Sequence, residues 1–174
     1  DKMLMNSFLI PLQEGVTIKG DTGVSVRSVL KDHFGLTYEY IDRKVSTVLL
    51  DGWVVDDMDR AIIKHGSVLA LSGAMPGLAG AAMRSRSFYG SFRNAITYHE
   101  KEMACEKKKG LFRIKLFNLL LTELGPELLK KGIIIEPHRI KTTLENTPQS
   151  MLATHIKEVS LDGTLLGLDE LQRW

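Results

Sequence analysis

The sequence predicts an α+β fold that begins with the element order ββαβββ. Short apolar runs end at turns rich in Gly and Asp, one amphipathic helix separates them, and an Asp-Gly pair joins two of them. A helix in this position can cover one face of a mixed sheet. The chain has 174 residues, 44% of them apolar and 25% charged, which suffices for one domain or two small ones.

Two strands and a helix are expected first. Leu4–Leu12 is an apolar run that ends at a Gln-Glu-Gly turn, and Val16–Lys19 alternates after it. From Ser25 the apolar residues recur at helical spacing on one side of a helix, while three charged residues occupy the other (apolar: Val26, Val29, Leu30, Phe34; charged: Arg27, Lys31, Asp32). Thr22 or Ser25 is the expected N-cap, and Gly35 ends the helix.

A β-hairpin is the strongest local signal in the chain. Val45–Leu50 and Trp53–Val55 are apolar runs joined by Asp51-Gly52, and Asp-Gly between such runs favours a tight hairpin turn. Ala61–Ile63, a turn at Lys64–Gly66 and the run Val68–Leu71 then supply the last strand.

The second half has a different pattern, so we expect two domains, residues 1–80 and 81–174. Residues 84–98 alternate loosely and favour a strand or an extended arm. The other expected elements are a helix over Leu111–Leu124, a short helix over Pro126–Lys131 ended by Gly132, a buried strand at Ile133–Ile135, a helix capped by Thr147-Pro148 and a hairpin at Leu161–Leu165.

The first 80 or so residues resemble the ubiquitin-like β-grasp sulfur carriers of molybdopterin and thiamine biosynthesis. The motifs that carry the resemblance are the helix start Val26–Leu30, the hairpin Val48–Val55 and the last strand with its turn, His65–Leu71. The family typically has Asn-Gly where this chain has Asp51-Gly52, and a Gly-Asp turn where it has Gly66-Ser67. The resemblance implies a β-grasp fold and a protein partner such as an adenylating enzyme or a cofactor synthase subunit.

The resemblance also implies a reactive tail, which this chain lacks in its usual form. Family members end in Gly-Gly, whose terminal carboxylate is adenylated and converted to a thiocarboxylate. Here the corresponding tail contains no Gly-Gly and is followed by 94 residues, so sulfur-carrier activity would require cleavage near Gly77 or Gly80. The candidate tail and partner-binding residues are Gly73, Met75, Pro76, Gly77, Leu78 and Gly80.

A basic segment suggests a second kind of partner. Between Arg84 and Lys115 the chain has nine basic and three acidic residues, with Phe and Tyr interleaved. Basic residues with exposed aromatics are typical of sites for single-stranded nucleic acid. The candidate polyanion-binding residues are Arg84, Arg86, Arg93, Lys107, Lys108 and Lys109. An acidic protein partner is favoured over nucleic acid.

The remaining patterns identify no catalytic residue, cofactor site or metal site. The single Cys105 excludes an internal disulfide, and the five histidines lack metal-ligand spacing. Three carboxylates, Asp56, Asp57 and Asp59, are expected to form a solvated turn rather than a cation site. Gly and Pro interrupt the uncharged stretch Gly66–Met83, so we expect no membrane span and a cytoplasmic location.

These observations favour a non-enzymatic protein-interaction module with a β-grasp domain. The alternatives are a sulfur-carrier precursor activated by cleavage, and a protein that binds single-stranded nucleic acid through residues 84–115. Apolar segments such as Leu116–Leu121 can be buried either against the β-grasp sheet or across a dimer interface, so a second copy of the chain is another candidate partner.

Overall fold

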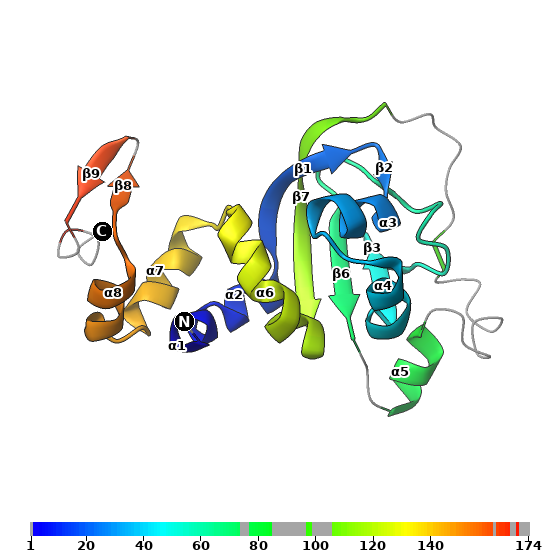
Figure 1. Ribbon diagram of the computed structural model, residues 1–174, viewed down its shortest axis with the longest axis horizontal. Helices are drawn as coiled ribbons and strands as arrows, with labels where there is room; N and C mark the ends of the chain where they lie inside the picture. Colours follow the sequence, from blue (N-terminus) through cyan, green and yellow to red (C-terminus); the bar gives the residue numbers. More distant parts are fainter. Residues whose placement is uncertain are drawn as a thin grey trace. The chain divides into compact units, whose positions relative to one another are not determined.

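The computed structural model describes residues 2–73, 77–84, 97–98, 106–161, 163–167 and 170 (Figure 1). Within this part of the chain the helices are α1 (Lys2–Ser7), α2 (Leu9–Glu14), α3 (Val26–Ser28), the π-helical turn η1 (Val29–His33), α4 (Tyr38–Lys44), α5 (Gly77–Met83), α6 (Leu119–Lys131), α7 (Pro137–Glu145) and α8 (Gln149–His155). The strands are β1 (Val16–Thr22), β2 (Val24–Ser25), β3 (Thr47–Leu50), β4 (Trp53–Val54), β5 (Ile62–Ile63), β6 (Val68–Ser72), β7 (Lys108–Phe117), β8 (Val159–Leu161) and β9 (Thr164–Leu166). The fold is mixed α+β, as predicted.

The chain divides into two compact units. One is Leu12–Ile134, and the other combines Asp1–Pro11 with Ile135–Trp174. This division differs from the expected domains 1–80 and 81–174, because β7 from the second half is a strand of the same sheet as β6. The second unit contains α7, α8 and the antiparallel pair β8–β9, in which Leu161 pairs with Thr164. That pair is the hairpin expected at Leu161–Leu165.

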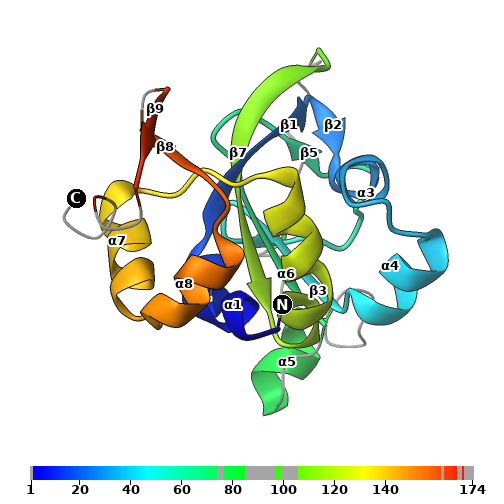
Figure 2. The ribbon, with the colours of Figure 1, turned by 60° about the vertical axis from the view of Figure 1, so that its left-hand side comes forward.

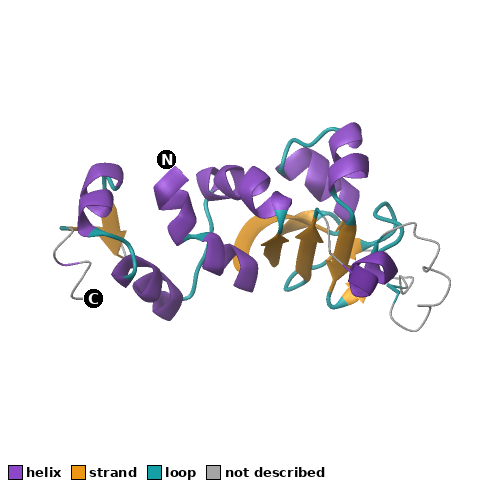
Figure 3. Cartoon of the chain, turned by 90° about the horizontal axis from the view of Figure 1, so that it is seen from below, coloured by secondary structure: helices purple, strands orange, loops and turns teal. Residues whose placement is uncertain are grey.

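The Leu12–Ile134 unit is built on a mixed five-stranded sheet in the order β1-β7-β6-β3-β4. The central pair β6–β7 is parallel, and the other pairs are antiparallel. Two views show β7 running beside β1, although about 90 residues separate the two strands in the sequence (Figure 1 and Figure 2). Helices lie along one face of the sheet (Figure 3), where α6 packs against β7 and β6.

Alternation along the strands separates a core face from a second face. The fully buried residues of the core face pair across neighbouring strands, for example Leu50 with Leu69 and Leu69 with Ile114. Residues one position away, such as Leu49 and Ala70, pair with each other on the opposite face and are only partly buried. We call this second face the pocket face, defined by Thr47, Leu49, Ala70, Ser72 and Phe117.

Several local predictions are confirmed. Ser25 is the N-cap of α3, where its side chain accepts a hydrogen bond from the Ser28 N–H at 3.1 Å. The predicted hairpin is β3–β4, and Asp51 and Gly52 have φ values of 52° and 86°, as a tight two-residue turn requires. Gly132 ends α6 with a φ of 89°.

Three other predictions are wrong. Leu4–Leu12 is not a strand but belongs to α1 and α2, and its run LMNSFLIPL has no alternation of period two. The expected helix over Leu111–Leu124 is a strand as far as Phe117, because Phe112, Ile114 and Leu116 alternate with Arg113 and Lys115. The third error is at Ile133–Ile135, where Ile134 forms only an isolated bridge to Thr17 and is 52% exposed.

Helix α6 joins the end of one expected helix to the next expected helix, whereas α8 begins where it was expected. Pro126 lies inside α6 rather than starting a new helix. Its missing N–H and its ring normally disrupt a helix, yet α6 continues to Lys131. Helix α8 begins directly after the predicted Thr147-Pro148 cap, with Pro148 as the N-cap.

Candidate functional site

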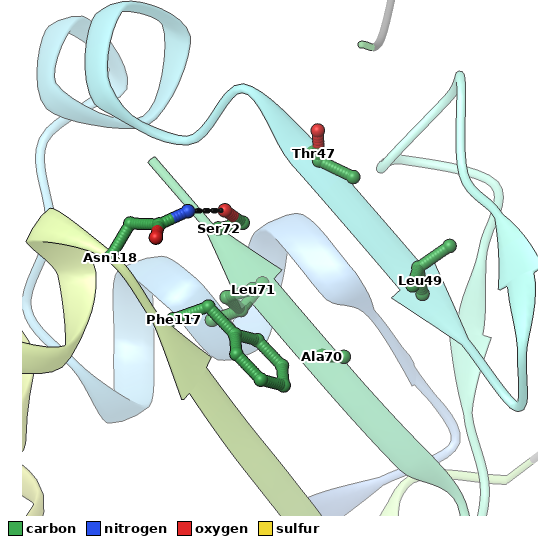
Figure 4. A pocket seen from close by; sticks show the side chains of 7 residues that line it. All are labelled: Thr47, Leu49, Ala70, Leu71, Ser72, Phe117 and Asn118. Atoms are coloured by element: carbon green, nitrogen blue, oxygen red, sulfur yellow. Dashed lines mark hydrogen bonds between the residues drawn. The ribbon is translucent and has the colours of Figure 1, made fainter. Parts of the chain in front are cut away.

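An apolar pocket of about 360 Å³ lies on the pocket face (Figure 4). Its lining residues come from β3, β6 and β7 and the residue that follows β7: Thr47, Leu49, Ala70, Leu71, Ser72, Phe117 and Asn118. The small side chain of Ala70 lies between Leu49, its partner on β3, and β7, and leaves the pocket space that a larger residue would fill. A concave, mainly apolar surface of this volume can hold a ligand or a partner side chain.

The polar end of the pocket is fixed by hydrogen bonds. The Asn118 side-chain amide donates to the Ser72 hydroxyl at 2.9 Å, which ties the end of β7 to the end of β6 (Figure 4). The backbone of Asn118 has a φ of 55°, which residues other than glycine seldom adopt. Strained backbone of this kind is found preferentially at binding sites, which makes this end of the sheet a candidate binding site.

The pocket is next to the predicted tail but does not include it. Gly73 follows Ser72 directly, and its carbonyl accepts a hydrogen bond from the Ser46 hydroxyl at 2.6 Å. Gly77 and Gly80 lie in α5, where Gly80 is buried, so these residues are helical rather than extended. Leu78 also belongs to α5, whereas Met75 and Pro76 lie outside the described residues.

The structure describes four of the predicted polyanion-binding residues, Arg84, Lys107, Lys108 and Lys109. Lys108 and Lys109 begin β7 after Lys107, and Arg84 follows α5. The others, Arg86 and Arg93, lie outside the described residues. Two of the lysines are bound to one carboxylate, because Asp21 accepts from Lys109 at 2.6 Å and from Lys107 at 3.3 Å. These contacts hold the pKa of Asp21 below its usual value.

A smaller, polar cavity of about 140 Å³ lies beside this ion pair. Its lining includes Lys19, Asp21 and His33. The His33 Nε2 atom is buried and has no hydrogen-bond partner in the described part of the chain. Burial lowers the pKa of His33, the positive charges of Lys131 and Lys109 lower it further, and Asp21 raises it.

We expect the stability of the chain to depend on pH through His33. Its pKa in the folded chain lies below the unfolded value of about 6.5, so the unfolded state takes up the proton first. Neutral His33 therefore contributes to the free energy of unfolding above about pH 6.5, and this contribution is lost as the pH falls through the folded pKa. We expect the urea midpoint of the wild-type chain to fall more between about pH 7.5 and pH 5.5 than that of His33→Gln. Equal losses in both chains would contradict a depressed pKa.

The described residues meet the requirements neither of a metal-ion cluster of His, Cys, Asp or Glu nor of a membrane-spanning helix. The described residues contain no group of three or more His, Cys, Asp or Glu side chains placed to hold a metal ion. In the expected solvated turn, Asp57 accepts the Asp59 N–H at 2.9 Å, and Asp59 also pairs with Arg27. Among the helices that the structure describes, none has both the length and the apolar character needed to cross a membrane.

Sequence reasoning missed the pocket because Phe117 belongs to β7 and Asn118 follows it, and this segment was assigned to a helix. The signal that could have found this strand is the alternation from Phe112 to Phe117. The pairing of β7 with β6 is not visible in the sequence. Comparison of the chain with family models, curated proteins and solved structures gave no match.

Proposed function

We propose that this chain is a protein-interaction module that takes an apolar side chain of a protein partner into the pocket on β3, β6 and β7. The observation that carries the proposal is the 360 Å³ pocket, whose walls are aliphatic and aromatic and whose polar groups are confined to one end. Anchor side chains buried in such pockets contribute a large share of the binding free energy at protein interfaces. The polar groups among the described lining residues are the hydroxyls of Thr47 and Ser72 and the amide of Asn118, with no His, Asp, Glu or Lys beside them to act as a general base, so binding is favoured over catalysis.

We further propose that the sheet is a β-grasp sheet in which one strand comes from a later part of the chain. The sequence led us to expect a strand over Leu4–Leu12 paired with the strand that begins at Val16. Residues 108–117 take that position instead, since β7 lies antiparallel beside β1. The mixed sheet, the β3–β4 hairpin and the helices on one face support the same fold.

Sulfur-carrier activity is less well supported than partner binding. Cleavage near Gly77 or Gly80 would separate β6 from β7, its parallel neighbour in the sheet. The fragment that ends near residue 80 would have to keep β7 in the centre of its sheet without a covalent link to it. An adenylating enzyme or a cofactor synthase subunit remains a candidate partner for the intact chain through the resemblance alone.

Affinity capture from native cells, quantified by mass spectrometry, tests the docking site through the variant Ala70→Gln. A longer polar side chain at this position would occupy the pocket without changing the net charge. We expect at least one protein to be captured by the wild-type chain and to be reduced about tenfold or more by Ala70→Gln, which corresponds to about 1.4 kcal/mol.

The matched control is Ala153→Gln, at an exposed position on α8. It introduces the same side chain outside the pocket and should leave capture unchanged. Urea unfolding of both variants shows whether they fold. If every captured protein binds folded Ala70→Gln as strongly as wild type, the pocket is not the docking site.

A further inference from the structure

The charges beside the pocket specify its partner more closely, if the proposed docking function holds. In the register of the sheet Lys115 lies next to Ala70, and along β7 it lies two residues before Phe117. Its side chain therefore lies on the pocket face beside two residues that line the pocket. Lys115 is not itself a lining residue of the pocket, but it adjoins Ala70 across the sheet and Phe117 along β7.

The stem of Lys115 packs over Gly15 of the neighbouring chain segment. A Cβ atom added to Gly15 would lie 3.0 Å from Lys115 Cγ and 2.9 Å from Arg113 Cδ, so the two stems pack closely over this glycine. Gly15 has a φ of 111°, which disfavours any larger residue there. The absence of a side chain at Gly15 thus gives room for two cationic side chains on the pocket face.

The charge balance of the pocket face is positive. The strands that line the pocket, β3, β6 and β7, contain no Asp or Glu, and β7 carries Arg113 and Lys115 in the same alternation as Phe117. Lys19, Asp21 and Lys109 line the polar cavity with His33 instead. Asp21 is already engaged by Lys109 and Lys107. Among the described residues neither Lys19 nor Lys115 has an ion-pair partner. The positive charge that remains is complementary to a carboxylate.

The same features favour an acidic protein segment over nucleic acid. Binding of single strands relies on several aromatic platforms along a continuous row of cations. The described residues that line the pocket include one aromatic ring, Phe117, among aliphatic residues. The basic residues form no continuous row of cations, because the acidic Asp21 lies between Lys107 and Lys109 and binds both. A peptide with a large apolar side chain next to a carboxylate matches both the apolar pocket and the cation beside it.

We propose that the partner is a protein segment that inserts an apolar side chain between Leu49, Ala70 and Phe117 and places an Asp or Glu carboxylate on Lys115. The structural basis is the register of Lys115 beside Ala70, at an apolar pocket whose strands carry no acidic residue. Such a pair at the edge of an interface is expected to be sensitive to salt.

Selection from a random-peptide phage-display library on the immobilised full chain tests this proposal. We expect the enriched peptides to carry Asp or Glu close to a large apolar residue. Fluorescence anisotropy with the selected peptides should show at least about tenfold weaker binding to Lys115→Glu and a smaller loss with Lys115→Gln. The control Lys157→Glu has the same charge change at an exposed position of the other unit and should bind as wild type does.

The variants separate failure of this inference from failure of the docking site. Peptides that lose binding to Ala70→Gln but contain no acidic residue, or bind Lys115→Glu normally, would overturn the acidic partner and leave the docking site standing. A selection without enrichment, or peptides that bind Ala70→Gln normally, would overturn both. Displacement of the peptides by a single-stranded oligonucleotide, with its binding lost in Lys115→Glu, would assign the site to nucleic acid instead.

Discussion

Replacement of Ile114 by alanine is expected to lower the free energy of unfolding of the Leu12–Ile134 unit by about 2–5 kcal/mol. Ile114 is fully buried in the centre of the sheet, where it pairs with Val16 on β1 and with Leu69 on β6. Truncation removes apolar surface from the core and leaves a cavity that the two neighbouring strands cannot fill. Urea unfolding followed by circular dichroism measures the change.

The chain provides a matched control for this variant in Ile134→Ala. Ile134 is 52% exposed and pairs with Thr17 through its backbone alone, so its truncation should change stability by less than about 0.5 kcal/mol. If Ile114→Ala were as mild as Ile134→Ala, residues 108–117 would not be a central strand. The proposed pocket, which depends on β7, would then fail with it.

Replacement of Arg27 by methionine is expected to cost about 2 kcal/mol of stability. The Arg27 side chain is largely buried and donates to Asp59 at 2.9 Å and to Asp42 at 3.3 Å. Loss of one partner from a fully buried ion pair costs about 3–5 kcal/mol. The expected cost is smaller here because the two carboxylates are 47% and 64% exposed and water can solvate them.

The control for Arg27→Met is Arg43→Met. Arg43 pairs with Glu39 at 3.0 Å, but both side chains are more than 70% exposed, and such surface pairs contribute about 0–1 kcal/mol. Comparison of the two variants by urea unfolding isolates the effect of burial, because the residue type and the substitution are the same. Equal effects would show that the Arg27 ion pairs contribute no more than a surface contact.

The elements that the sequence predicted correctly are those defined by neighbours along the chain. The hairpin at Asp51-Gly52 and the caps at Ser25 and Gly132 depend on backbone geometry within a few residues. Arg27 shows the limit of such reasoning. Its place opposite the apolar residues of the helix gave no sign of burial, yet Asp42 and Asp59 approach it from other parts of the chain.

The proposed site was less predictable than the fold class. Ser72 and Gly73 adjoin the pocket in the structure. The sequence therefore indicated this end of β6, but it assigned the end to a reactive tail rather than to a pocket. Lys115 was counted in the basic segment, without any sign that it lies beside Ala70. Residues 45 positions apart become neighbours only through the parallel β6–β7 pairing.

By itself the sequence determined the α+β class, the turns, the caps and most of the strands of the first half, because these follow from local periodicity and from residues with restricted backbone angles. Only the tertiary structure decided which strands become neighbours. Leu4–Leu12 and Phe112–Phe117 are both apolar runs that could have paired with β1, and the alternating run takes that position. It does so because alternation lets one strand bury Phe112, Ile114 and Leu116 in the core while it holds Lys115 and Phe117 at the pocket face.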